Sequence, residues 1–99
     1  MLINIPFQYS FKDKMLNNGK TCTSRTKKYG NPGDKFEIFG ATFVITKITR
    51  LSLNFIANHL FEEEGCNSPG NFRSVWLTLH ERSGWRPLQR VYVHFFRKE

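Results

Sequence analysis

The spacing of apolar residues divides the first part of the chain into short elements. Residues 2–8 begin with β-branched and aromatic side chains and alternate loosely, which predicts a strand. After Ser10, a suitable helix cap, apolar residues recur on one helical face until Gly19. Residues 20–28 contain three threonines and favour an extended backbone.

A turn and three further strands are predicted after this segment. Residues 29–34 read YGNPGD, in which the proline fixes one central φ and the following glycine accepts a positive one. In residues 35–53, apolar and polar residues alternate before and after a turn at Gly40 and Ala41. This pattern predicts two paired strands. Residues 88–99 alternate again. The residues expected on the buried faces are Phe36, Ile38, Phe43, Ile45, Ile48, Leu88, Val91, Val93 and Phe95.

Two helices are predicted between these strands. Ser52 precedes apolar residues at helical spacing that continue to Gly65. A second helix begins after Ser68, with Pro69 at the first helical position, and Gly84 marks its end. Too few helices separate the strands for a doubly wound sheet. We therefore predict one α+β domain over the whole chain, residues 1–99, with a small curved sheet or barrel flanked by helices.

Composition adds a strong positive charge to this picture. Fifteen Lys and Arg against eight Asp and Glu give a net charge of +7, an excess typical of proteins that bind nucleic acid. The N-terminal residues do not resemble a signal peptide, and no apolar run approaches the ~20 residues that span a bilayer. We therefore expect a cytoplasmic protein without a membrane partner.

The cysteines and histidines do not indicate a metal site. Cys22 and Cys66 are expected to be free thiols in a reducing compartment. His59, His80 and His94 are far apart and lack metal-ligand spacing, so we expect them at the surface or in interfaces.

The segment GKTCTSR, residues 19–25, concentrates candidate chemistry. Thr21, Thr23 and Arg25 share one face of a regular strand, so Lys20 joins them only if the backbone bends before the strand begins. The cluster could bind phosphate, or it could supply a hydroxyl and an amine to a reaction. Both interpretations remain open from these residues alone.

Five short motifs in order resemble the ASCH domain family of the PUA-like superfamily, over nearly the whole chain. They are K-T-x-T-x-R after a glycine, G-D, E-G, S-P-x-x-F-x-x-x-W and G-W-x-P. Their residues are Gly19, Lys20, Thr21, Thr23, Arg25, Gly33, Asp34, Glu64, Gly65, Ser68, Pro69, Phe72, Trp76, Gly84, Trp85 and Pro87. The resemblance implies a PUA-like small mixed β-barrel flanked by helices, a cleft between barrel and helices, and an association with RNA and modified nucleotides.

The resemblance also implies a possible activity. Some small ASCH proteins hydrolyse N4-acetylcytidine to cytidine and acetate with a Lys, a Thr and a Glu. Their roles would fall on Lys20 as the base, Thr23 as the nucleophile and Glu64 as the acid/base residue. A lysine acts as a base only when its pKa falls well below about 10.4, and Arg25 could contribute to that shift.

We predict a monomer that binds RNA or a modified cytidine nucleoside in a polar cleft, without a metal or other cofactor. The predicted ligand contacts are Lys20, Thr21, Thr23, Arg25, Lys27, Lys28, Tyr29, Glu63, Glu64, Trp85 and Arg86. Which of the three glutamates 62–64 faces the cleft stays open. Hydrolysis of N4-acylated cytidines is the alternative function, and a partner-binding module with a vestigial cleft is a third.

Overall fold

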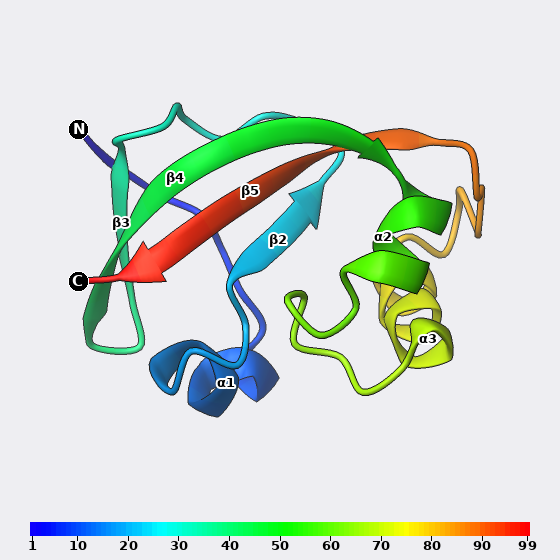
Figure 1. The fold of residues 1–99 in the computed structure, drawn as a ribbon, viewed down its shortest axis with the longest axis horizontal. Helices are drawn as coiled ribbons and strands as arrows, with labels where there is room; N and C mark the ends of the chain where they lie inside the picture. The colour runs from blue at the N-terminus through cyan, green and yellow to red at the C-terminus, as the bar shows by residue number, and fades with distance from the viewer.

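One curved mixed sheet of five strands organises the chain in the computed structural model, which describes residues 1–99 (Figure 1). The strands are β1 (Leu2–Ile3), β2 (Cys22–Arg25), β3 (Lys35–Ile38), β4 (Ala41–Ser52) and β5 (Arg90–Lys98). Their order in the sheet is β1-β3-β4-β5-β2, with only the β1–β3 pair parallel. With the helices described below, the sheet confirms the predicted α+β class.

The two long strands β4 and β5 form the curved centre of the sheet (Figure 1). The turn into β4 is made by Phe39 and Gly40, both with positive φ. The register of β4 against β5 shifts between Ile45 and Lys47, so one extra residue is accommodated there. Such a bulge bends a strand and increases its twist, which fits the curvature at this point.

One short helix precedes β2, and two further helices lie between β4 and β5 in the chain. A 3-10 turn η1 (Tyr9–Phe11) leads into α1 (Lys12–Leu16), and α2 (Leu53–His59) and α3 (Pro69–Leu79) pack together beside the end of β4 (Figure 1). The predicted caps of α2 and α3 are confirmed. The Ser52 and Ser68 hydroxyls accept hydrogen bonds from the N–H groups of Phe55 and Asn71. None of the helices combines the length and apolarity needed to cross a bilayer.

Several boundaries differ from the sequence prediction. Helix α2 ends at His59 rather than near Gly65, and turns occupy the glutamate-rich segment that follows. Carboxylates are unfavourable at a helix C-terminus, which accounts for the early end. Helix α3 likewise ends before Gly84, and the first helix begins without a cap from Ser10. Strand β1 covers only two of the residues predicted for it.

Two apolar cores pack against the sheet. The helix-side core lies between the sheet and helices α2 and α3, and contains Cys22, Leu53, Ile56, Ala57, Cys66, Phe72, Trp76, Val91 and Val93. The sheet-side core contains Ile5, Met15, Phe36, Phe43, Ile45 and Phe96. Strand β5 contributes to both cores, so both of its faces are covered.

Two expectations for the end of the chain are corrected, and the double coverage of β5 explains the first of them. His94 is fully buried, although its position in the sequence suggested a surface or interfacial residue. Leu88 lies outside β5 and is 84% exposed, although the alternation placed it on the apolar face.

Gly65 has a left-handed backbone and lies in close contact with its neighbours. Its φ is +87°, and a Cβ there would lie 3.1 Å from Lys20 Cβ and 3.3 Å from the Phe11 ring.

Gly65→Ala should therefore lower the free energy of unfolding by about 2–4 kcal/mol, because left-handed strain and crowding add. Gly33→Ala is the matched control. Its φ is +95° with nothing within 4 Å, so it should cost only about 1–2 kcal/mol. Urea unfolding measures both losses, and equal losses would contradict the tight packing around Gly65.

Candidate ligand-binding cleft

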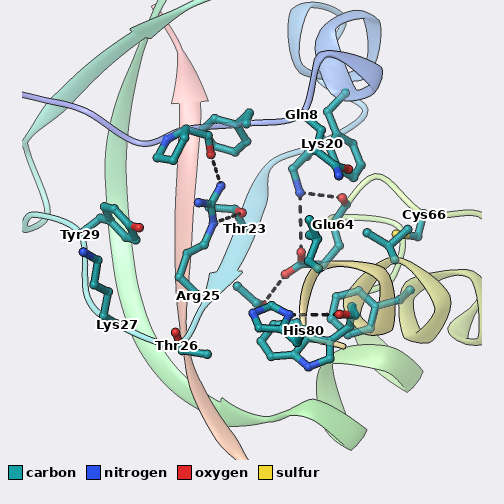
Figure 2. A pocket seen from close by; sticks show the side chains of 18 residues that line it. Gln8, Lys20, Thr23, Arg25, Thr26, Lys27, Tyr29, Glu64, Cys66 and His80 are labelled. Carbon is teal, nitrogen blue, oxygen red and sulfur yellow. Dashed lines mark hydrogen bonds and ion pairs between the residues drawn. The ribbon is translucent and has the colours of Figure 1, made fainter. Parts of the chain in front are cut away.

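A cavity of about 470 Å³ opens along β2, an edge strand of the sheet. Its walls come from the segment before α1, from β2 and the residues after it, from the turn that follows α2, and from α3 (Figure 2). The apolar part of the lining consists of Phe7, Phe11, Phe72, Val75, Trp76 and Leu79. The cavity therefore lies between the two cores and is bounded by both.

Lys20 and Glu64 form a buried ion pair on one wall of the cavity. Their side chains are 3% and 5% exposed, and Lys20 Nζ lies 3.6 Å from Glu64 Oε1. The ammonium also donates a hydrogen bond of 2.7 Å to the Glu64 backbone carbonyl, and it lies 4.5 Å from the centre of the Phe11 ring. Figure 2 shows the two side chains pointing toward each other. Of the three consecutive glutamates, Glu64 is the one that lines the cavity.

The carboxylate of Glu64 also accepts bonds from β2. Ser24 Oγ donates to Oε2 at 2.6 Å, and the Cys22 thiol lies 3.4 Å from the same oxygen. Burial, together with the Glu64 carboxylate, raises the pKa of the Cys22 thiol, so Cys22 is a neutral donor here. Lys20, Cys22 and Ser24 alternate along the chain and share one side of the strand. Sequence reasoning missed Ser24, although its position four residues after Lys20, an even number along an extended segment, could have indicated it.

Thr23 and Arg25 point to the other side of β2. Thr23 Oγ1 accepts a hydrogen bond of 3.1 Å from Arg25 Nε, and the guanidinium also donates to the Pro6 carbonyl. Arg25 lies 4.9 Å from the Phe7 ring and 5.6 Å from the Tyr29 ring. Burial lowers the pKa of Arg25, but a guanidinium titrates so high that it stays charged.

The cavity therefore has two polar groups of different character. Thr23 has no hydrogen bond to Lys20 or Glu64, so the three residues expected to act together are divided between the two groups. The hydroxyl that reaches the buried carboxylate belongs to Ser24.

Tyr29 and His94 fix the cavity wall beyond Arg25. His94 Nε2 accepts a hydrogen bond of 2.9 Å from the Tyr29 backbone N–H, and Nδ1 lies 3.3 Å from the Thr23 carbonyl. Both contacts are satisfied when the ring is neutral with its proton on Nδ1. Lys27 lies 5.0 Å from the centre of the Tyr29 ring (Figure 2).

Three of the predicted contact residues lie close to the cavity but outside its lining. The Glu63 carbonyl accepts from the N–H groups of Thr21 and Cys22, so Glu63 acts through its backbone. The Lys28 ammonium donates to the Asn31 side chain at 2.8 Å. Thr21, Lys28 and Glu63 are thus neighbours of the site rather than part of its wall.

Trp85 and Arg86 lie elsewhere. Trp85 packs against the helix-side core, edge-on to Phe72, with Arg73 5.3 Å from its ring. Arg86 is exposed in the segment after α3. In their place, α3 brings His80 to the cavity, where its ring stacks on Trp76 at 3.8 Å between centres. The spacing of four residues between Trp76 and His80 predicts their contact, but no local pattern indicated that it would lie in the cleft.

The burial of His94 generates a pH dependence. Burial lowers the pKa of His94 below its usual value near 6.5, so the unfolded chain takes up this proton at higher pH than the folded protein. The free energy of unfolding should be highest above pH 6.5. It should fall as pH drops from there toward the lower folded-state pKa, by at most about 1.4 kcal/mol per pH unit.

Urea unfolding between about pH 5 and pH 7.5 tests this expectation in the wild type and in His94→Gln. The variant should lose most of the dependence, whereas the control His59→Gln, at an exposed position, should keep it. A dependence that survives in His94→Gln would assign the effect to other groups.

Comparison with known proteins supports the fold through structure alone. No family model matches the sequence, and no curated protein matches it. The ASCH domain from Lactobacillus crispatus superposes with a TM-score of 0.70 at 11% identity, covering 97% of this chain and 76% of that one. The hypothetical protein PH0355 gives a TM-score of 0.71 at 14% identity, covering 94% of each chain.

A third solved structure, protein EF3133 from Enterococcus faecalis, gives a TM-score of 0.65 at 13% identity, covering 91% of this chain and 67% of that one. Identities this low establish similarity of fold and nothing finer. The five-stranded mixed sheet with its flanking helices is therefore the ASCH-like fold that the sequence motifs predicted.

Proposed function

We propose that the cleft binds one nucleotide of an RNA strand, with the base inside the cavity and its phosphate near the cationic wall. The observation that carries this proposal is the composition of the cavity. A buried ion pair and a hydroxyl lie among aromatic and aliphatic side chains, and Arg25 and Lys27 line the opposite part of the wall. A few convergent polar groups in a mostly apolar hollow are typical of small-ligand sites.

The inner wall has the chemistry to recognise a base edge. Glu64 Oε1 is an acceptor that lies 3.6 Å from Lys20 Nζ, whereas the hydrogen bonds from β2 go to Oε2. An ammonium has three donors, and one of these is used by the Glu64 carbonyl. An adjacent acceptor and donor complement the hydrogen-bonding edge of an unpaired base. The surrounding rings cover the base faces, as in many single-strand RNA sites.

The opposite wall has the chemistry to hold a phosphate. Three ion pairs exist in the protein, and their cations are the N-terminus, Lys20 and Lys35. Arg25 and Lys27 therefore have no acidic partner. The ASCH-like fold adds support, because the family that the motifs resemble is associated with RNA.

Lys27→Gln should weaken binding of a fluorescein-labelled single-stranded RNA, because one phosphate-facing charge is lost. The slope of log affinity against log salt should fall by about 0.7. Lys47→Gln is the matched control, since Lys47 is also exposed and lies 5.5 Å from an aromatic ring, but does not line the cavity. Fluorescence anisotropy from about 50 to 200 mM salt measures both variants. Absent or salt-independent binding by the wild type would overturn the proposal.

A second candidate is hydrolysis of an N4-acylated cytidine, favoured by one contact. The Ser24 hydroxyl lies 2.6 Å from a carboxylate that also faces Lys20, all on the cavity wall. A carboxylate at that distance can take the hydroxyl proton as the oxygen attacks the acyl carbon, and return it to the leaving N4 amine, which leaves an acyl ester on Ser24. Water that gives its proton to the same carboxylate then attacks the ester, releases the carboxylic acid and restores the Ser24 hydroxyl. Thr23, the nucleophile by resemblance, has its oxygen turned to Arg25 instead.

Incubation with N4-acetylcytidine, followed by chromatography for cytidine, tests this candidate. If it holds, Ser24→Ala should reduce turnover by about 100-fold or more, because removing a nucleophile or its base removes the reaction path. Thr23→Val keeps the shape of the side chain and should keep most of the activity. If Thr23→Val instead loses turnover and Ser24→Ala keeps it, the nucleophile is Thr23. No cytidine from wild type at high protein concentration would remove the candidate and leave RNA binding untouched.

A further inference from the structure

A second basic surface adjoins the cleft on the same side of the sheet. Across the strands, Arg25 of β2 pairs in register with Tyr92 of β5, and Tyr92 pairs with Arg50 of β4. Residues directly opposite in neighbouring strands point to the same face. Arg90 lies two residues before Tyr92 on β5 and shares that face. We call Arg50, Arg90 and Tyr92 the arginine–tyrosine patch.

The two arginines of the patch are held in place by each other. Arg50 Nη2 donates to the Arg90 carbonyl at 3.2 Å, and Arg90 Nη2 donates to the Arg50 carbonyl at 3.1 Å. The Arg50 guanidinium also lies 4.8 Å from the centre of the Tyr92 ring. Both arginines are exposed, and each has five N–H donors, so most donors face solvent. A guanidinium that is already positioned loses less entropy when it binds an anion.

The charge around the patch is not balanced by any carboxylate. Neither arginine forms an ion pair, and the same holds for Lys27 and Lys28, which follow β2. That segment is fixed to β5 by the bond from the Tyr29 N–H to His94, two residues from Tyr92. Arg25 lies in the same part of the sheet, because it pairs in register with Tyr92. Such a group of like charges is relieved by a bound polyanion.

We propose that the arginine–tyrosine patch binds the phosphates of nucleotides adjacent to the one in the cavity. A single RNA strand would then run from the cavity, past Arg25, over the ends of β5 and β4. Arg25 and Arg50 lie two strand spacings apart, about 10 Å, so the path is continuous. This inference rests on the proposed function, because the strand is anchored by the base in the cavity. It adds the path that the strand takes outside the cavity and the residues that hold its phosphates there.

The test is a length series of single-stranded RNA, from one to about six nucleotides, with the double variant Arg50→Gln/Arg90→Gln. The variant should bind the longest RNA about tenfold more weakly at low salt, and its salt slope should fall by about 1.4, from two lost phosphate contacts. The loss should grow with length. Arg50→Lys/Arg90→Lys keeps the charge and should recover part of the affinity.

Arg82→Gln/Arg97→Gln is the matched control, because it removes the same charge from two exposed arginines without a side-chain hydrogen bond. It should leave the length series unchanged. If both double variants weaken binding equally, the patch is not the path and only this inference fails. If polyphosphate of equal charge binds with the same dependence on the patch, the surface is a general anion site and the inference also fails. If wild type binds no RNA of any length, the proposed function fails with it.

Discussion

The buried pair of Lys20 and Glu64 is the constraint on which the site depends. Taking two charges out of water costs several kcal/mol for each, and their attraction repays this only with good additional hydrogen bonds. Those bonds are present: Lys20 donates to the Glu64 carbonyl, and the carboxylate accepts from Ser24 and lies near the Cys22 thiol. Well-packed apolar side chains would stabilise the fold about as well, so the pair contributes little net stability. Its effect is positional, because it joins the start of β2 to the turn after α2.

The link between the start of β2 and the turn after α2 also bears on the position of the cavity beside β2. The backbone of the turn extends the link, since the Glu63 carbonyl accepts from the N–H groups of Thr21 and Cys22 at the start of the strand. The rest of β2 is an edge, and its side chains Ser24 and Arg25 line the cavity on their two sides. The helix-side core and the sheet-side core are each closely packed, and β5 contributes to both. The space between them is bounded by side chains that pack against one core or the other.

Local features such as helix caps could be predicted from the sequence. The direction in which each side chain of a strand points could not. The caps at Ser52 and Ser68 were predictable because a hydroxyl before a helix satisfies a nearby N–H wherever the helix lies. The choice between Thr23 and Ser24 was not, because it depends on where the backbone becomes a regular strand, and a shift of one residue exchanges the faces. His94 was predicted at the surface or in an interface for a similar reason. Alternation of apolar and polar residues identifies one covered face of a strand, but this curved sheet has a core on both faces. Glu64 was chosen by resemblance, and its inward turn depends on the early end of α2, which the helical spacing of apolar residues up to Gly65 did not indicate.

The buried pair and the exposed cations differ in what they can contribute to binding: the pair to selectivity, and the cations to affinity. The inner pair is neutral overall and nearly closed to solvent, so it interacts only with a group that enters the cavity and matches its donor and acceptor. The arginines and lysines on the same side of the sheet are exposed and unpaired, so they attract any phosphate within about a Debye length. In nucleic-acid complexes phosphate contacts position the ligand, and base contacts specify it. Arg25 belongs to both regions, because it lines the cavity and pairs in register with Tyr92. In the proposed complex, Arg25 would therefore couple the position of the RNA backbone outside the cavity to the depth of the base inside it.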